Sequence, residues 1–390
     1  MILIDKMVKL MNILVISHYG LYENLSFSFI HNQIKEFVKE GNKVKVIIPI
    51  AVAKKDFESK RFGRILKKRV VEGIELYYIR YVSLSKYGND SFNYQSAKMM
   101  LSYQLNKIIK DFKPSIIHAH TIEFDGEIGV FLKERLGCPL VITTHGSDTI
   151  VPMLHNRSTY IKKICDNANI VVAVSEHLKR VLSQCGTNTP IKVIYNGHNF
   201  NANKRNYIKQ RYSIIQVGHL IAQKNFDKTI KAFSLVKKYY PESILKIIGS
   251  GNEYDNLKAL CSKLDLTNSV VFLGEVDNDT VLTELAKSEL FIMPSIREGF
   301  GIVYLEAMSN GCVTIGSKGE AISELIQSGI NGILVDPNDI EQISNVIKDC
   351  FNDIEYMNLL SMRGRESVKQ LTWKENAQKY ISLFQYEIDD

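Results

Sequence analysis

The sequence has no run of about 18 consecutive apolar residues, which excludes a membrane-spanning helix. Its six cysteines lie far apart, without a Cys-x-x-Cys pair or a His cluster at metal-ligand spacing, so we expect reduced thiols in a cytoplasmic protein. The first ten residues lack the apolar core and cleavage site of a secretory signal. With 390 residues, 45% apolar and 23% charged, the chain is a globular protein of two or three domains rather than a disordered tail or a disulfide-rich peptide.

Positive charge is concentrated in the first half of the chain. Residues 1–200 hold 28 Lys and Arg against 17 Asp and Glu, whereas residues 201–390 hold 21 against 25. Much of the excess lies between Lys54 and Arg69, a run typical of a solvated loop or helix face. The alternative is a patch for an anionic membrane surface, where each cation adds about 1 kcal/mol. We expect no nucleic-acid partner, because no recognised binding module accompanies the patch.

Short apolar runs alternate with segments of helical period, which indicates stacked βαβ units and parallel sheets. A first series of strands is predicted at 12–17, 43–49, 74–80, 115–119, 139–143, 169–174 and 191–195, with a helix over about 26–40. A second series is predicted at 213–217, 243–248, 269–273, 290–293, 313–316 and 332–335. The polar, aperiodic segment 196–211 between the two series is the expected linker, and two helices over about 353–370 and 372–386 close the chain.

The pattern therefore predicts an α/β protein with two Rossmann-like, doubly wound parallel-sheet domains that face each other across a central cleft. We place an N-terminal domain at 1–200, a C-terminal domain at 201–370, and a final helix at 371–390 that packs back on the N-terminal domain. Ligands of such sheets bind beyond the carboxyl ends of the strands. Residues that directly follow strands are therefore the candidate site residues.

The strongest candidate motif is Arg297-Glu298-Gly299-Phe300-Gly301, which follows a strand and opens the helix that carries Glu306. Its glycines let the backbone approach a ligand, and the N–H groups of a first helical turn suit a diphosphate. Glu298 and Glu306 are eight positions apart, so both carboxylates can accept hydroxyl groups of one ligand. Either glutamate alone would be interpreted as a solvated side chain, but the complete motif with both glutamates favours a ligand-binding site.

Two more loops follow strands in the second series. In Gly218-His219-Leu220-Ile221-Ala222-Gln223-Lys224, the lysine stands near the start of the next helix, where an ammonium can neutralise phosphate oxygens. A surface lysine is the alternative. The turn Gly249-Ser250-Gly251 is weak evidence alone.

Histidines end two strands of the first series. His118 and His120 share a face of one strand, and His145 follows the next strand. An isolated histidine is more often structural, but this pairing favours function, and we expect His118 and His120 to contact an acceptor. A metal would need a third ligand that the sequence does not identify. Gly20 follows the first strand, where a phosphate can approach its backbone.

Together these motifs resemble the glycosyltransferases of the GT-B fold, and above all the retaining, nucleotide-sugar-dependent glycosyltransferase family 4. The segments Val174 to Lys179 (an S-x-x-L pattern), Asn196-Gly197 and Asn331 to Pro337 also resemble that family. The likeness extends from Asn12 to about Leu371 and is most specific between Pro294 and Glu324.

The resemblance implies roles for individual residues. Glu298 would contact the donor sugar, Glu306 the ribose, and His145 the transferred sugar. The implied catalytic residues are His145, Glu298 and Lys224. The implied donor-binding residues are Gly20, His219, Lys224, Gly249, Ser250, Gly251, Glu298, Gly299, Phe300, Gly301, Glu306 and Glu324.

Three departures from the family pattern stand out. His219 occupies the usual position of an arginine, Tyr19-Gly20-Leu21 has one glycine where two are usual, and the GG-x-x-E segment reads Lys318-Gly319-Glu320-Ala321-Ile322-Ser323-Glu324. A neutral histidine lacks the permanent charge and fork of arginine, so diphosphate binding would depend more on Lys224.

The expected function is transfer of a hexose from a nucleotide diphosphate sugar, with a UDP-sugar favoured, to a hydroxyl of a glycan or polyprenyl-diphosphate-linked acceptor. The expected outcome is retention at the anomeric carbon, without cofactor or metal, in bacterial surface polysaccharide biosynthesis at the inner face of the membrane. Two alternatives are a nucleotide-sugar 2-epimerase of the same architecture and a non-catalytic sugar-nucleotide-binding protein.

Overall fold

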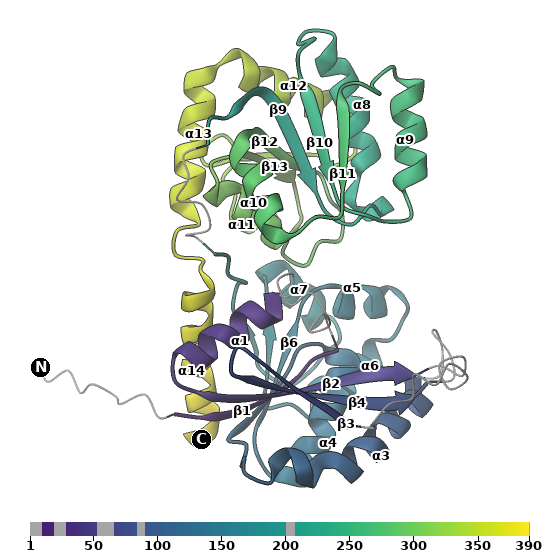
Figure 1. Ribbon diagram of the computed structural model, residues 1–390, viewed down its shortest axis with the longest axis vertical. Coiled ribbons are helices and arrows are strands. Elements are labelled where there is room, and N and C mark those ends of the chain that lie inside the picture. Colours follow the sequence, from purple (N-terminus) through teal and green to yellow (C-terminus); the bar gives the residue numbers. More distant parts are fainter. Residues whose placement is uncertain (1–9, 19–28, 53–65, 84–89, 200–206, 390) are drawn as a thin grey trace, which may run out of the picture. The chain divides into compact units, whose positions relative to one another are not determined.

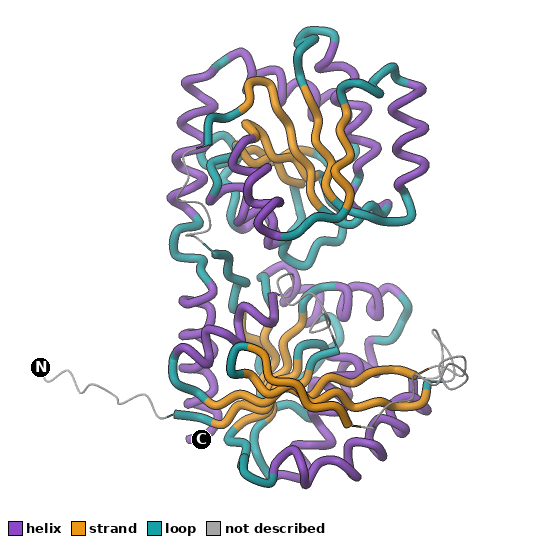
Figure 2. Tube along the Cα trace, in the orientation of Figure 1, coloured by secondary structure: helices purple, strands orange, loops and turns teal. Residues whose placement is uncertain are grey.

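The protein forms two compact α/β units (Figure 1). A computed structural model describes residues 10–18, 29–52, 66–83, 90–199 and 207–389. The N-terminal unit extends to Val174 and also takes in Leu178–Ile194 and Trp373–Asp390, whereas the C-terminal unit comprises Ser175–His177 and Tyr195–Thr372. Each unit contains one sheet with helices packed around it (Figure 2). The C-terminal sheet is parallel throughout, and the N-terminal sheet is parallel apart from the edge strand β3. The predicted pair of doubly wound α/β domains is thereby confirmed.

The N-terminal sheet has the strand order β3-β4-β2-β1-β5-β6-β7-β8. Its strands are β1 (Asn12–Ile16), β2 (Lys43–Val52), β3 (Leu66–Val71), β4 (Ile74–Val82), β5 (Ile116–Ala119), β6 (Leu140–Thr144), β7 (Ile170–Ala173) and β8 (Ile191–Val193). Its helices are α1 (Phe29–Lys39), α3 (Asp90–Ile109), α4 (Glu127–Leu136), α5 (Ser147–Leu154), α6 (Ser158–Cys165), most of α7 (Glu176–Ser183), and α14 (Trp373–Asp389). Only the β3–β4 pair is antiparallel among the paired strands described.

Both faces of this sheet are buried, because helices cover each face. Along β1, Leu14 and Ile16 belong to one apolar cluster, whereas Ile13 and Val15 belong to another. Successive side chains of a strand point to opposite faces, so a strand between two helical layers is apolar at every position. This explains the continuous apolar run with which the strand is recognised in the sequence.

The basic stretch between Lys54 and Arg69 is only partly described, since residues 53–65 lie outside the described residues. The prediction of a loop or helix is wrong for its end, because Lys67, Lys68 and Arg69 lie in β3, which pairs with β4. These three residues are exposed at the edge of the sheet. Charged side chains on an edge strand discourage pairing with another chain.

The C-terminal sheet has the order β11-β10-β9-β12-β13-β14, and all its paired strands are parallel. Its strands are β9 (Gln210–Val217), β10 (Ile244–Ile248), β11 (Val270–Gly274), β12 (Ser288–Met293), β13 (Val313–Ser317) and β14 (Ile333–Val335). Its helices are α8 (Phe226–Lys237), α9 (Tyr254–Lys263), α10 (Asn278–Lys287), α11 (Ile302–Ser309), α12 (Ile340–Asn352) and α13 (Ile354–Ser367). The strand order reverses between β9 and β12, which defines the crevice at their carboxyl ends.

The last helix, α14, belongs to the N-terminal unit, where it lies beside α1 (Figure 1). Gln33 donates a hydrogen bond of 2.7 Å to the side chain of Asn376. The rings of Tyr380 and Phe384 pack against Phe37, with centroids 6.3 and 5.7 Å away. None of the described helices is both long and apolar enough to cross a membrane.

Replacing Phe384 by Ala tests how much α14 contributes to the N-terminal unit. Phe384 is fully buried, so Phe384→Ala should lower the free energy of unfolding by about 3–5 kcal/mol, measured by urea denaturation. Tyr386→Ala is the control on the same helix, because Tyr386 is 60% exposed, and it should cost less than about 1 kcal/mol. Equal losses for the two variants would contradict this packing.

Candidate functional site

Two loops meet where the strand order of the C-terminal sheet reverses. β9 ends at Val217 and continues into Gly218–Lys224, and β12 ends at Met293 and continues through Arg297–Gly301 into α11. β9 and β12 are hydrogen-bonded neighbours, so the two strongest sequence motifs of this unit follow adjacent strand ends.

Direct hydrogen bonds join these two loops. Asn225 donates its side-chain amide to the carbonyl oxygens of Pro294 (2.8 Å) and Pro337 (3.3 Å). The N–H of Ile296 donates to the carbonyl oxygen of Gln223 at 2.9 Å. Asn225 has φ of +50°, a left-handed conformation that asparagine tolerates better than most residues. The sequence analysis assigned no role to Asn225, although an asparagine directly before a helix is a recognisable signal.

Lys224 and Glu298 form an ion pair in this crevice. Each side chain is 18% exposed, so the pair is largely shielded from water. The backbone N–H of Glu298 donates to the Glu320 carboxylate at 2.9 Å, and the preceding Arg297 has φ of +60°. Two of the three residues predicted to be catalytic are thus in contact, and Glu320 holds the backbone of one of them.

The backbone after Glu298 presents unused donors. Within the described part of the chain, the N–H groups of Gly299, Phe300 and Gly301 have no acceptor, and no side chain caps α11. Gly301 has φ of +79°, and a Cβ there would lie 2.6 Å from the Tyr304 ring, so only glycine fits. Unused N–H groups at the start of a helix attract anions.

Glu306 lies on α11 and is half-buried. Its carboxyl group has no hydrogen-bond or ion-pair partner among the described residues, and burial raises its pKa to about 7. A partly buried carboxyl without a partner is a favourable acceptor for hydroxyl groups of a ligand.

Glu324 is engaged within the protein. Its carboxylate accepts the N–H groups of Glu176 (2.8 Å) and His177. Burial, followed by the nearby Glu324 carboxylate, raises the pKa of the Tyr195 hydroxyl to about 12. In this arrangement Glu324 holds the backbone at Glu176 and His177, which belong to the same unit.

Ser175 and Tyr195, both in the C-terminal unit, contact the Glu298 loop. Ser175 is buried and donates its hydroxyl to the carbonyl oxygen of Gly299 at 2.8 Å. The rings of Tyr195 and Phe300 stack with centroids 5.5 Å apart. These contacts span more than 100 residues of sequence and have no local sequence signal beyond the S-x-x-L pattern.

Gly249 and Gly251 make close backbone contacts. A Cβ on Gly249 would lie 1.9 Å from the carbonyl oxygen of Gly218, and one on Gly251 would lie 2.3 Å from that of Leu220. The N–H of Leu220 donates to the carbonyl oxygen of Ser250 at 2.9 Å. The glycines therefore let the loop after β10 press against the loop that carries Lys224. Ser250 itself is exposed and donates to Glu275.

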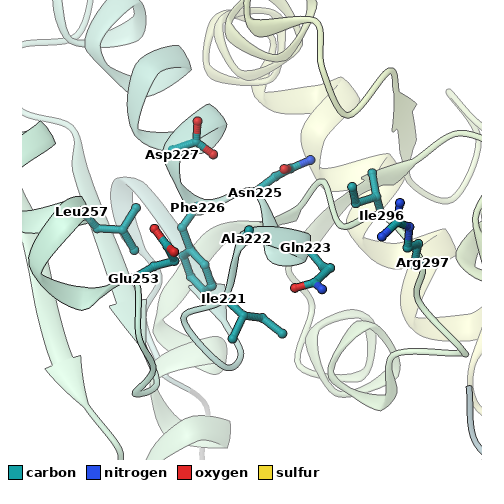
Figure 3. Close-up of a pocket in the computed structure, with 10 residues that line it drawn as sticks. All are labelled: Ile221, Ala222, Gln223, Asn225, Phe226, Asp227, Glu253, Leu257, Ile296 and Arg297. Carbon is teal, nitrogen blue, oxygen red and sulfur yellow. The ribbon is translucent and has the colours of Figure 1, made fainter. Parts of the chain in front are cut away.

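A pocket of about 470 Å³ opens beside this loop (Figure 3). Its lining residues are Ile221, Ala222, Gln223, Asn225, Phe226, Asp227, Glu253, Leu257, Ile296 and Arg297. They include the immediate sequence neighbours of Lys224 and of Glu298. Five of these ten residues are apolar and five are polar or charged, so the pocket offers both apolar contact and hydrogen-bonding groups. His219 is exposed, and its side chain makes no hydrogen bond within the described residues.

A second cluster lies at strand ends of the N-terminal unit. His120 follows β5, His145 follows β6, and their ring nitrogens Nδ1 and Nε2 are 3.2 Å apart. Asp148 accepts the backbone N–H of His145 at 2.9 Å. His118, by contrast, is fully buried in β5 and bonds the hydroxyl of Thr143 at 2.8 Å, so it stabilises the core.

Gly20 lies outside the described residues. Across the ranges that the structure describes, no group of three or more His, Cys, Asp or Glu side chains is arranged to hold a metal ion.

Comparison with known proteins agrees with this architecture. Residues 199–367 match the family described as Glycosyl transferases group 1, and residues 28–201 match Glycosyltransferase Family 4. An uncharacterized glycosyltransferase of Methanocaldococcus jannaschii is 28% identical over 276 residues, which cover 70% of this chain and 76% of that protein. N-acetyl-alpha-D-glucosaminyl L-malate synthase of Bacillus anthracis is 25% identical over 328 residues, covering 80% and 84%.

Solved structures share the fold over nearly the whole chain. HepE of Anabaena, in complex with UDP and glucose, has a TM-score of 0.74 at 19% identity and covers 96% of this chain and 99% of its own. Sucrose-phosphate synthase of Thermosynechococcus elongatus has a TM-score of 0.77 at 17% identity, covering 96% and 98%. Two α/β domains of this kind define the GT-B fold. The chain belongs to the GT-B glycosyltransferases and resembles family 4, as its motifs predict.

The pKa of Glu306 predicts a pH-dependent stability. A carboxyl that titrates near 7 when folded and near 4.5 when unfolded holds its proton better in the folded state between these values. The protonated carboxyl therefore contributes to the free energy of unfolding at low pH, and this contribution is lost as the pH rises through 7. In urea denaturation, the free energy of unfolding of Glu306→Gln relative to that of the wild type should rise by about 1–3 kcal/mol from pH 5 to pH 8. Glu242→Gln, at an exposed loop position, should show the same difference from the wild type at both pH values.

Proposed function

We propose that the chain transfers a hexose from a nucleotide diphosphate sugar, with a UDP-sugar favoured, to a hydroxyl of a glycan or lipid-linked acceptor, with retention at the anomeric carbon. The observation that carries this proposal is the shielded Lys224–Glu298 pair beside three unused backbone N–H groups. Together they offer one cation and several donors to an anion, next to a carboxylate for sugar hydroxyls.

In the proposed reaction the bond between the anomeric carbon and the β-phosphate oxygen breaks. The acceptor oxygen bonds the same carbon on the same face, and its proton passes to the departing diphosphate. Negative charge grows on that diphosphate, where Lys224 and the N–H groups of Gly299–Gly301 stabilise it. Phosphate oxygens compete with Glu298 for Lys224, which frees the Glu298 carboxylate to accept a sugar hydroxyl. Glu306 accepts the ribose hydroxyls.

The choice of UDP is supported by the fold relatives, since HepE is known in complexes with UDP and with UDP-glucose. A hexosyl donor is consistent with the neighbouring carboxylates, because hexose hydroxyls donate hydrogen bonds to them. His145 is proposed to contact the transferred sugar, on the resemblance to family 4.

The acceptor side of the proposal depends on the N-terminal unit. Its basic excess suits a polyprenyl-diphosphate-linked acceptor, and the stretch between Lys54 and Arg69 is proposed to contact anionic lipid. We propose a cytoplasmic enzyme of bacterial surface polysaccharide biosynthesis that acts at the inner face of the membrane.

Incubation with UDP- and GDP-sugars tests the activity. Donors are first ranked by the increase in melting temperature, and release of nucleoside diphosphate is then measured with and without glycan acceptors. Release should be stimulated by acceptor, and Lys224→Ala should reduce it about 100-fold or more. Lys228→Ala, in the first turn of α8, should retain near wild-type release. Conversion of the donor sugar without transfer would indicate an epimerase, and binding without either reaction a non-catalytic protein.

We also propose that transfer requires no divalent cation, because Lys224 and the backbone donors meet the charge of the leaving group. Release of nucleoside diphosphate should therefore stay within about twofold when EDTA replaces MgCl₂. A loss of more than tenfold that MgCl₂ or MnCl₂ restores would overturn this part of the proposal.

A further inference from the structure

The N-terminal sheet has a topological switch point of its own, between β1 and β5. In the strand order β2-β1-β5-β6, β2 lies on one side of β1 and the later strands lie on the other. Ile16 at the end of β1 pairs with Ala119 at the end of β5. Ligands of doubly wound sheets bind at such a point, beyond the carboxyl ends of the strands. The residues that follow β1 and β5 are therefore placed to contact a ligand of this unit.

A histidine and an aspartate from these two segments lie against each other. His18 follows β1, and Asp125 lies in η2 (Ile122–Gly126), which follows β5. Nδ1 of His18 is 2.9 Å from Oδ2 of Asp125, and the same oxygen accepts the backbone N–H of His18 at 3.3 Å. The Asp125 side chain is fully buried, whereas 36% of the His18 side chain is exposed. The carboxylate therefore holds an imidazole that a ligand can reach.

His18 is the cation that compensates Asp125. Within the described ranges, no lysine or arginine lies within ion-pair distance of Asp125, and its second oxygen, Oδ1, is buried without a hydrogen-bond partner. A buried carboxylate is unfavourable unless a cation compensates it. Burial acts to lower the pKa of His18, but the adjacent Asp125 carboxylate, aided by Asp148 of α5, outweighs this effect and raises the pKa above its ordinary value.

The neighbouring strand ends carry histidines of the opposite kind. His120 follows β5 and His145 follows β6, and burial lowers the pKa of both imidazoles. Of these three histidines, His18 alone has a raised pKa. A protonated imidazole at the switch point of the sheet suits an anion, and a phosphate group in particular.

We propose that His18 binds a phosphate group of a substrate with its imidazolium, and that Asp125 is the positioning residue that keeps this imidazole charged. The inference rests on the proposed function for the identity of the substrate. The proposed nucleotide-sugar donor and the proposed polyprenyl-diphosphate-linked acceptor both carry a diphosphate, so the chemistry recognised is the same for the two.

The charge of His18 is measured by NMR on the full chain with ¹⁵N-labelled histidine, and its ring signals are assigned by their loss in His18→Gln. In a pH titration, the pKa of His18 should lie above 6.5 in the wild type. Asp125→Asn keeps the shape of the side chain but removes its charge. Burial then dominates, so the pKa of His18 should fall below 6.5 in this variant.

Inorganic pyrophosphate is the probe for binding. It should shift the ring signals of His18 and raise the pKa of His18 further, because a bound anion favours the imidazolium. The signals of His155, an exposed histidine that follows α5, are the internal control and should stay in place.

Kinetics distinguish the two sources of phosphate. His18→Gln should raise KM about tenfold for the UDP-sugar if His18 binds the donor, or for the polyprenyl-diphosphate-linked glycan if it binds the acceptor. In the wild type the same KM should rise as the pH passes the pKa of His18, and in Asp125→Asn this rise should occur at lower pH. A merely structural contact would not move this pH profile. His155→Gln is the matched control and should leave both KM values within about twofold.

A wild-type pKa of His18 at or below 6.5, ring signals that pyrophosphate leaves in place, or unchanged KM values for both substrates in His18→Gln would overturn the inference. Absence of any donor turnover in the wild type would contradict the proposed function instead, and the response of His18 to pyrophosphate would still decide whether this residue binds phosphate.

Discussion

The hydrogen bonds of Asn225 to Pro294 and Pro337 are the constraint on which the candidate site depends. Parallel pairing of β9 with β12 brings two loops to one edge of the sheet. Strand pairing alone does not fix the position of these loops relative to each other. The buried amide of Asn225 does so, because it ties the start of α8 to the chain just after β12. Lys224, the residue before it, consequently reaches Glu298 across the crevice.

Much of the fold is predictable from the sequence, because a parallel strand covered on both faces is apolar throughout. The runs at 12–17, 290–293 and 313–316 coincide closely with β1, β12 and β13. The exception is β3, half of whose residues are charged. An exposed edge strand has no buried face, so its sequence lacks the apolar period that identifies the others.

The candidate site is predictable in part. Lys224 and Glu298 each follow a strand, and the strand order then brings them together. The roles of Ser175 and Glu324 were not accessible in this way, because their partners are distant in sequence. His118 illustrates a further limit. The alternation of β5 puts it on the same face as His120, and both are buried, but His118 lies within the strand and bonds Thr143, whereas His120 follows the strand and lies beside His145.

The candidate site combines carboxylates, a lysine and backbone N–H groups. Glu298, Glu306 and Glu320 supply carboxylates, whereas Lys224 is already neutralised by one of them. His219 adds no fixed cation in the position where family 4 usually has an arginine. An incoming diphosphate would therefore be met chiefly by oriented N–H dipoles, which, unlike a lysine, need not be released from a carboxylate before they bind. In the proposed complex the carboxylates then accept the hydroxyl groups of the same molecule, so that one site would accommodate both the anionic and the hydrogen-bond-donating ends of a nucleotide sugar.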